Sequence, residues 1–327
     1  MKNSRRVPAE ARTSGAVVER VLLLWLVAVL APSCGHAQSS EEELSDLKRL
    51  VAPLFEVPHQ GISEMSGLTR SHNYPGVYWV HNDSGDDPRL FSISGEGELV
   101  WPPFVDRSSW DGLPIAVAAN VDWEDITTDG EYLYIAETGN NGNARRDLGV
   151  YVVPEPNPRA IEITRSLRFL PVAYPEQTIY PGRQWHYDSE AMFTAGGELF
   201  LITKHRVESK ISAFEKGANL YRLASRHTAI VNELEFIATD TELAIVTGAD
   251  VAPGGQYLAV LSYDALWVYG APADNRAWLA NPVGHIKLDR DYTQQVEAIT
   301  WSDDETILIG NEQGTVFKVE RRSLPQP

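Results

Sequence analysis

Cysteine is nearly absent from this chain of 327 residues: Cys34 is the only one. No internal disulfide can form, so a folded domain has to be held together by its core. Long hydrophobic runs are missing too: the most apolar stretch, residues 21–30 (VLLLWLVAVL), is too short to span a bilayer comfortably. No long stretch has the 3.6-residue periodicity of an amphipathic helix, and this argues against a helical protein.

Positive charge is also scarce. The chain has 28 Lys and Arg residues against 45 Asp and Glu residues, for a net charge of −17. Residues 1–37 hold five of the basic and two of the acidic residues, so the remainder has 23 basic and 43 acidic residues and a net charge of −20. Binding to phosphates needs a basic surface, so the composition argues against nucleic acid and anionic membranes as partners. It is compatible with binding cations.

The first 37 residues have the order of charge and hydrophobicity of an export signal. Basic residues precede the apolar stretch, and small residues follow it. Two cleavage sites remain open. Cleavage after Ala37 would remove residues 1–37, whereas cleavage before Cys34 would remove residues 1–33 and leave a lipid on the cysteine. Both predict an extracytoplasmic protein, either secreted or periplasmic or lipid-anchored, that contacts a membrane only through a lipid on Cys34. Residues 38–49 are then predicted to form a polar tether.

A short phrase recurs along the rest of the chain. It contains an acidic residue, then a small or acidic residue, then usually an apolar one, and its copies are spaced by roughly 50 to 65 residues. The copies cover residues 63–68, 123–127, 189–193, 249–252 and 296–300. Two runs rich in β-branched and aromatic residues follow each copy, as expected of β-strands.

This repeat predicts an all-β fold, a single β-propeller over residues 50–322 with four antiparallel strands in each blade. Five copies predict five blades. Six blades remain the alternative, because residues 100–120 and 160–187 are long enough to contain a degenerate blade. Residues 50–58 are apolar enough to form a strand that pairs with the last blade and closes the ring. Residues 323–327 are then a short tail.

The phrase opens the innermost strand of each blade, so its acidic side chains are expected near one mouth of the central channel. Two such charges a few ångströms apart repel by about 4 kcal/mol at an effective dielectric constant near 20. The group therefore needs protons, amide donors or a cation, and oxygen ligands favour calcium over zinc. Alternatively, each carboxylate caps the backbone of a neighbouring blade. The predicted metal ligands are Glu64, Glu124, Glu190, Asp250 and Glu297.

A second set of polar residues ends the second strand of each unit. Neighbouring strands of a blade run antiparallel, so these residues should return to the same mouth. A ligand-binding role is the first interpretation, and simple hairpin-turn chemistry is the alternative. The predicted ligand-binding residues are His81, Asn82, Asp83, Glu137, Lys204, His205, Asn311 and Glu312.

Several of these segments together resemble the phytase-like and SdiA-regulated bacterial propellers. The resemblance rests on residues 62–68 and 78–84 of the first unit, with 190–192, 201–204 and 296–299 in later ones, and it covers most of residues 60–320. It implies a secreted or lipid-anchored propeller with calcium at its axis, and no established reaction. The full set of Asp-rich and Lys/Arg-rich motifs of the β-propeller phytases is not found in this chain.

Three functions remain open. The first is a propeller that binds a small polar ligand or a protein partner at a calcium-organised mouth. The second is a metal-dependent hydrolase, a phosphoesterase or a lactonase, in which Glu190 or Glu297 is metal ligand or base and Lys204 or His205 stabilises developing negative charge. The third is a glycosidase with a carboxylate pair. Its candidate sugar-stacking residues are Trp79, Trp123 and Trp185.

Overall fold

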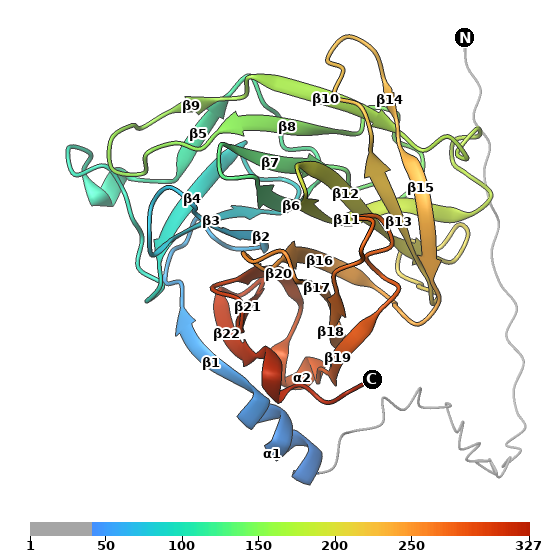
Figure 1. Cartoon of the computed structure of the whole chain (residues 1–327). Helices are drawn as coiled ribbons and strands as arrows, with labels where there is room; N and C mark the ends of the chain where they lie inside the picture. Colours follow the sequence, from blue (N-terminus) through green and yellow to red (C-terminus); the bar gives the residue numbers. More distant parts are fainter. Residues whose placement is uncertain (1–40) are drawn as a thin grey trace, which may run out of the picture. The chain divides into compact units, whose positions relative to one another are not determined.

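The computed structural model describes residues 41–327, and these form five β-sheets (Figure 1). The predicted export signal, both cleavage sites and Cys34 lie outside the described residues. Each sheet has four antiparallel strands in the order expected of a propeller blade, which confirms the all-β, five-bladed prediction. Two of the blades carry one additional short strand at the outer edge, paired in parallel.

The strands are best followed blade by blade, from the innermost strand outward. Blade 1 contains β2 (Met65–Arg70), β3 (Val77–Asn82), β4 (Arg89–Ser94), β5 (Leu113–Ala116) and the additional β9 (Thr164–Arg165). Blade 2 contains β6 (Trp123–Thr128), β7 (Tyr132–Glu137), β8 (Gly149–Pro154), β10 (Arg168–Ala173) and the additional β14 (Asn232–Glu233). Blade 3 contains β11 (Trp185–Ala195), β12 (Glu198–Arg206), β13 (Ala218–Leu223) and β15 (Glu235–Asp240).

Blade 4 contains β16 (Val246–Val251), β17 (Tyr257–Ser262), β18 (Ala265–Gly270) and β19 (Pro282–Lys287). Blade 5 contains β20 (Val296–Trp301), β21 (Thr306–Asn311), β22 (Thr315–Glu320) and β1 (Val51–Glu56). The two segments that left room for a sixth blade contribute their strands to blades 1, 2 and 3. Residues 100–120 include the short helix η1 (Arg107–Ser109) and β5, and residues 160–187 include β9, β10 and the start of β11.

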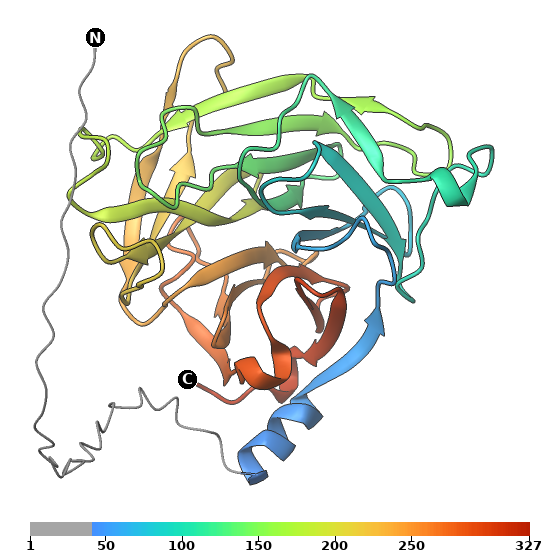
Figure 2. The same ribbon diagram turned by 180° about the vertical axis from the view of Figure 1, so that it is seen from behind.

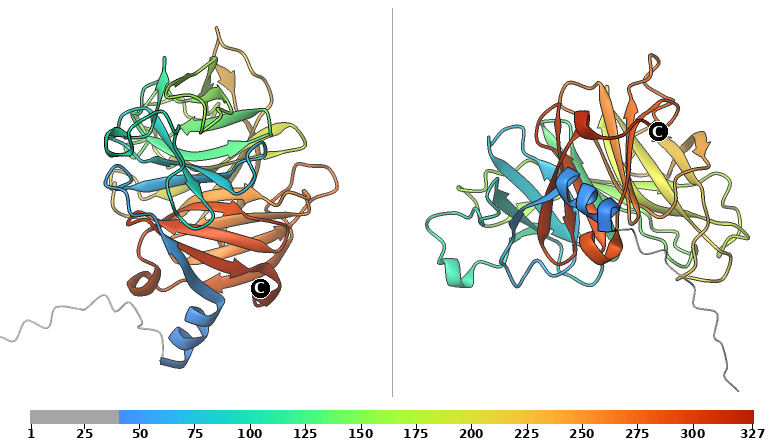
Figure 3. Two further views of the ribbon diagram at one scale, coloured as in Figure 1. Left: turned by 90° about the vertical axis from the view of Figure 1, so that its left-hand side faces the viewer. Right: turned by 90° about the horizontal axis from the view of Figure 1, so that it is seen from below.

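The N-terminal strand closes the ring as predicted. Strand β1 pairs antiparallel with β22, from Val51 opposite Val319 to Glu56 opposite Thr315. Figures 2 and 3 show α1 and β1 running along the edge of blade 5. Residues 41–49 of the expected polar tether belong to helix α1 (Glu41–Leu50), whose Leu47 is buried in the core of that blade. No helix within residues 41–327 is both long and apolar enough to cross a bilayer.

The C-terminal end is also ordered. The short helices α2 (Arg290–Thr293) and η2 (Arg321–Ser323) flank blade 5 in the sequence. In the predicted tail, Leu324 is buried, and the carbonyl of Pro325 accepts a hydrogen bond from the backbone of His285 in β19. The tail therefore packs against blade 4.

The hydrophobic core lies between adjacent blades. One cluster, for example, joins Phe193 and Ile202 of blade 3 to Val246, Leu258 and Val260 of blade 4. The inner strands β2, β6 and β20 are buried along nearly their whole length, because blades pack on both of their faces. This packing fixes the inner strands around the axis and so positions both mouths of the propeller.

Candidate functional site

Every inner strand contains a β-bulge, an interruption in its pairing with the second strand of the blade, in its N-terminal half. A bulged residue has no single partner opposite it, and the local twist redirects its side chain. The interruptions fall near the same end of all five inner strands. The residues within them are Ser66 in β2, Glu124 and Asp125 in β6, Glu190 in β11, Thr247 in β16 and Glu297 in β20, and β11 has a further interruption at His186 and Tyr187. The recurring sequence motif therefore marks a bulge in each inner strand, and these bulges lie at one mouth of the propeller.

Acidic side chains gather at this mouth. Carboxylate oxygens of Asp83, Asp122 and Glu124 lie within 4.8 Å of one another, and those of Glu124, Asp188 and Glu190 form a second such group. Glu297 lies at the same mouth: burial raises the pKa of Asp83, and the charge of Glu297 adds to this effect. We call these six residues the acidic mouth.

Glu124 is the residue shared by both groups. It is only 5% exposed, and none of the hydrogen bonds or ion pairs among residues 41–327 involves its carboxylate. Burial, and then the charges of Glu190 and Asp83, raise its pKa well above the ordinary value. A carboxylate that is buried, surrounded by like charges and without a donor is unfavourable unless a proton or a cation offsets it.

Two members of the second group, Asp188 and Glu190, already have counter-charges. Lys204 Nζ lies 2.6 Å from Glu190 Oε2, and Arg206 Nε lies 2.7 Å from Asp188 Oδ2. Arg206 also reaches Glu190 Oε1 at 3.2 Å. Both basic side chains are buried, and burial still raises the pKa of Glu190 to about 8 despite these partners. By contrast, no ion pair within the described part of the chain involves Asp83 or Asp122.

Glu297 occupies a separate corner of the acidic mouth. The Tyr263 hydroxyl donates a hydrogen bond to its Oε1. Burial raises the pKa of Glu297 to about 7, and the charge of nearby Glu312 adds to this effect. Burial raises the pKa of Glu312 as well, followed by the charge of Glu64, which is itself exposed. The predicted first-blade ligand Glu64 therefore lies beside Glu312 and outside the two groups of three.

Asp250 does not join the acidic mouth, so its predicted equivalence with Glu124, Glu190 and Glu297 is wrong. Thr247 occupies the bulge of β16, and Asp250 lies three residues further along, at the other end of the strand. Its Oδ2 accepts hydrogen bonds from Thr300 Oγ1 at 2.8 Å and the Trp301 backbone at 2.9 Å. Asp250 thus links blade 4 to blade 5, as in the alternative capping interpretation of these carboxylates.

The two predicted ligand-binding histidines are packed into the wall. His81 is fully buried, and its Nδ1 contacts the Asn82 carbonyl at 2.9 Å. Burial lowers the pKa of His81 to about 4. His205 stacks on His186 with ring centroids 3.7 Å apart, and burial lowers its pKa to about 3. The rings of His81 and His205 are therefore neutral near pH 7.

Three other predicted ligand-binding residues hold loops at the mouth. The Asn82 amide donates to the Gly61 carbonyl and to Asp86, and the Asn311 amide donates to the Thr293 carbonyl. Glu137 accepts hydrogen bonds from the backbones of residues 121 and 122 and pairs with Arg145 at 2.7 Å. These side chains shape the rim, and Asp83 is the member of the predicted set that belongs to a group of three carboxylates.

The sequence reasoning missed Asp122, Asp188, Arg206 and Tyr263. A signal for the two aspartates was present, because each lies two residues before a bulged glutamate: Asp122 before Glu124 and Asp188 before Glu190. Residues two apart in a strand point to the same face, so this repeated Asp-x-Glu spacing indicates paired carboxylates. Arg206 and Tyr263 lie among the polar residues that end the second strands, but their roles depend on contacts across strands that the sequence does not show.

No family model matches the chain, and no curated protein matches it. Several solved structures are similar. The PQQ-bound aldose sugar dehydrogenase of Streptomyces coelicolor is 10% identical with a TM-score of 0.45, over 83% of this chain and 97% of that one. A glucose dehydrogenase is 12% identical with a TM-score of 0.43, over 82% and 98%. The Dos1 propeller is 9% identical with a TM-score of 0.35, over 80% and 59%.

Proposed function

We propose that this protein is an extracytoplasmic β-propeller that binds a calcium ion at Asp83, Asp122 and Glu124, and a small polar ligand through that ion. The observation that carries the proposal is the Glu124 carboxylate, which is buried, has no hydrogen-bond donor among the described residues and lies against the carboxylates of Asp83 and Asp122, neither of which forms an ion pair there. The extracytoplasmic location rests on the order of residues 1–37, and the export signal remains a prediction.

The spacing of the three carboxylates suits a hard cation. Calcium is bound by oxygen atoms at about 2.3–2.6 Å, so ligands on opposite sides of the ion lie about 5 Å apart. The oxygens of Asp83, Asp122 and Glu124 lie within 4.8 Å of one another, inside that limit. All three are carboxylates, which favours calcium or magnesium over zinc. The second group is a poorer cation site, because Lys204 and Arg206 already pair with its Glu190 and Asp188.

The small polar ligand follows from the coordination number. Three carboxylates provide fewer than the six to eight oxygen atoms that calcium takes, so the remaining positions are filled by water or by a ligand. Asp83 and Asp122 are only half-buried, so these positions open toward the solvent side of the mouth. Hydroxyl and carboxylate groups of a small ligand provide oxygens of the kind required.

A metal-dependent hydrolase, a phosphoesterase or lactonase, is the second candidate. It is favoured by Glu297, whose pKa of about 7 suits proton transfer at neutral pH. A bound cation would supply an activated water. Lys204 is less suited to stabilising negative charge, because it is paired with Glu190. A glycosidase is less favoured still, because its candidate stacking residues Trp79, Trp123 and Trp185 are all buried.

The proposal is tested by thermal melting of the purified protein after EDTA treatment, with calcium or magnesium added back. An ion that binds only the folded chain stabilises it by about 2.7 kcal/mol at a hundredfold excess over its Kd. We expect calcium to raise the melting temperature of the wild type and of the control Glu96→Gln, which removes an exposed carboxylate. We expect Glu124→Gln to abolish the rise.

Two results separate the candidates. Calcium-dependent hydrolysis of a phosphoester or lactone that is lost in Glu297→Gln would establish the hydrolase. A calcium response without hydrolysis would support ligand binding alone. An unchanged melting temperature in calcium, with no metal found by elemental analysis, would reject the cation site.

A further inference from the structure

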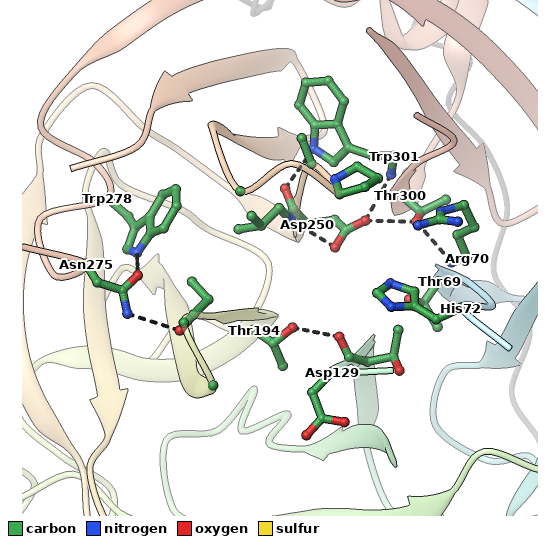
Figure 4. Close-up of a pocket in the computed structure, with 18 residues that line it drawn as sticks. Thr69, Arg70, His72, Asp129, Thr194, Asp250, Asn275, Trp278, Thr300 and Trp301 are labelled. Carbon is green, nitrogen blue, oxygen red and sulfur yellow. Dashed lines mark hydrogen bonds between the residues drawn. The ribbon is translucent and has the colours of Figure 1, made fainter. Parts of the chain in front are cut away.

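A cavity of about 630 Å³ lies at the other mouth of the propeller, at the ends of the inner strands opposite to the acidic mouth (Figure 4). Ligand pockets of proteins typically measure about 300–1,000 Å³, so its size suits a small organic molecule. All five inner strands contribute to its lining, and the contributing residues include Arg70 of β2, Thr128 of β6, Thr194 of β11, Asp250 of β16 and Thr300 of β20.

The acidic groups of this cavity are already satisfied. Asp250 accepts three hydrogen bonds, from Val251, Thr300 and Trp301. Asp129 accepts from the backbones of Glu131 and Tyr132 through Oδ1, while its Oδ2 accepts from a tyrosine hydroxyl. Neither carboxylate has an oxygen left without a donor, so neither calls for a cation.

Donors of the lining such as Thr300 and Asn275 are already bonded, but three polar side chains at one wall form no such bond within the described chain. Within residues 41–327, no hydrogen bond or ion pair involves the Arg70 guanidinium, the Thr69 hydroxyl or the His72 ring. All three belong to the end of β2 and the turn that follows it. In Figure 4 they lie together at one wall, beside Thr300 and Asp250. The Arg70 charge acts on Asp250, whose pKa is raised by burial and partly lowered by Arg70, but no ion pair among the described residues occupies the guanidinium. Its N–H donors therefore remain for a ligand in the cavity.

We propose that this cavity binds a small organic anion, whose carboxylate or phosphate group is held by Arg70. Guanidinium presents a planar fork of N–H donors that matches the oxygens of either group, and such paired contacts are among the stronger hydrogen bonds in proteins. Thr69 and His72 provide further polar contacts beside it. The site lies at the opposite end of the inner strands from the acidic mouth, so it does not depend on the calcium proposal.

Isothermal titration calorimetry in EDTA tests the site with three probes that share a six-carbon chain: gluconate, sorbitol 6-phosphate and neutral sorbitol. We expect an anionic probe to bind and sorbitol not to bind, and the anion that binds better identifies carboxylate or phosphate as the preferred group. Arg70→Gln should weaken that binding at least tenfold. Arg159→Gln, which removes an exposed arginine elsewhere, should leave it unchanged.

Two further variants keep the test independent of folding. Arg70→Lys retains the charge but loses the planar fork, so it should bind with intermediate affinity, and Thr69→Val should weaken binding without removing any charge. The Arg70 guanidinium forms no hydrogen bond or ion pair among the described residues and acts on Asp250 only through its charge, so melting of Arg70→Gln should stay close to that of the wild type. Failure of both anions to bind the wild type, or equal binding to wild type and Arg70→Gln, would overturn the proposal.

Discussion

Asp125 is the side chain whose removal should damage this propeller most directly. It belongs to the bulge of β6 and is fully buried. Its Oδ1 accepts the backbone N–H of Ile126 at 2.8 Å, and its Oδ2 accepts those of Met192 at 2.8 Å and Ala249 at 3.2 Å. One carboxylate therefore ties the inner strands of blades 2, 3 and 4 together at the axis.

The expected loss in Asp125→Ala follows from the three N–H groups that lose their acceptor. A buried donor left without a partner costs about 1–3 kcal/mol, so the variant should lose at least roughly 3 kcal/mol of unfolding free energy. This is a large share of the 5–15 kcal/mol that is typical of folded domains. At about 2–4 °C per kcal/mol for a domain of this size, the melting temperature should fall by roughly 6–12 °C.

Urea denaturation and thermal melting of Asp125→Ala measure this loss. The matched control is Asp87→Ala, an exposed aspartate whose replacement should change stability by less than about 0.5 kcal/mol. Asp125→Asn keeps one carbonyl oxygen, so its loss should be intermediate. A loss below about 1 kcal/mol in Asp125→Ala would refute the idea that this carboxylate holds the three blades together.

Three further predictions concern pH, the cation site and ring closure. Burial raises the pKa of Glu297 from 4.5 to about 7, so its stabilising contribution is complete below pH 4.5 and is lost as the pH rises to 7. In EDTA, Glu297→Gln should therefore reduce the fall in stability across that interval by up to roughly 3 kcal/mol, measured by urea denaturation at each pH. Gly139→Ala would place a methyl group against the carboxylates of Asp122 and Glu124, so calcium titrations should show at least tenfold weaker binding. Deletion of residues 41–56 exposes the edge of β22, and size-exclusion chromatography should show aggregation.

The candidate site was only partly predictable. Antiparallel pairing within each unit implied that Asp83 and Lys204 would return to the mouth where Glu124 and Glu190 begin, and they do. The equivalence of Asp250 failed, because the shared feature of the repeats is a bulge and not the acidic residue itself. A bulge depends on how two strands pair, so the residue pattern of one strand does not reveal it.

From the sequence alone came the all-β propeller, five blades as the first choice over six, and the expected closure of the ring by residues 50–58. These follow from the repeated alternation of phrase, strand and turn, which is a local property of the chain. The folded ring was needed to show which carboxylates meet and which of them pair with Lys204 and Arg206. It also shows that Glu124 and Arg70 face opposite mouths without a hydrogen bond or ion pair among the described residues. Those facts depend on contacts between blades far apart in the sequence, and the distances across the axis exist only once the ring has closed.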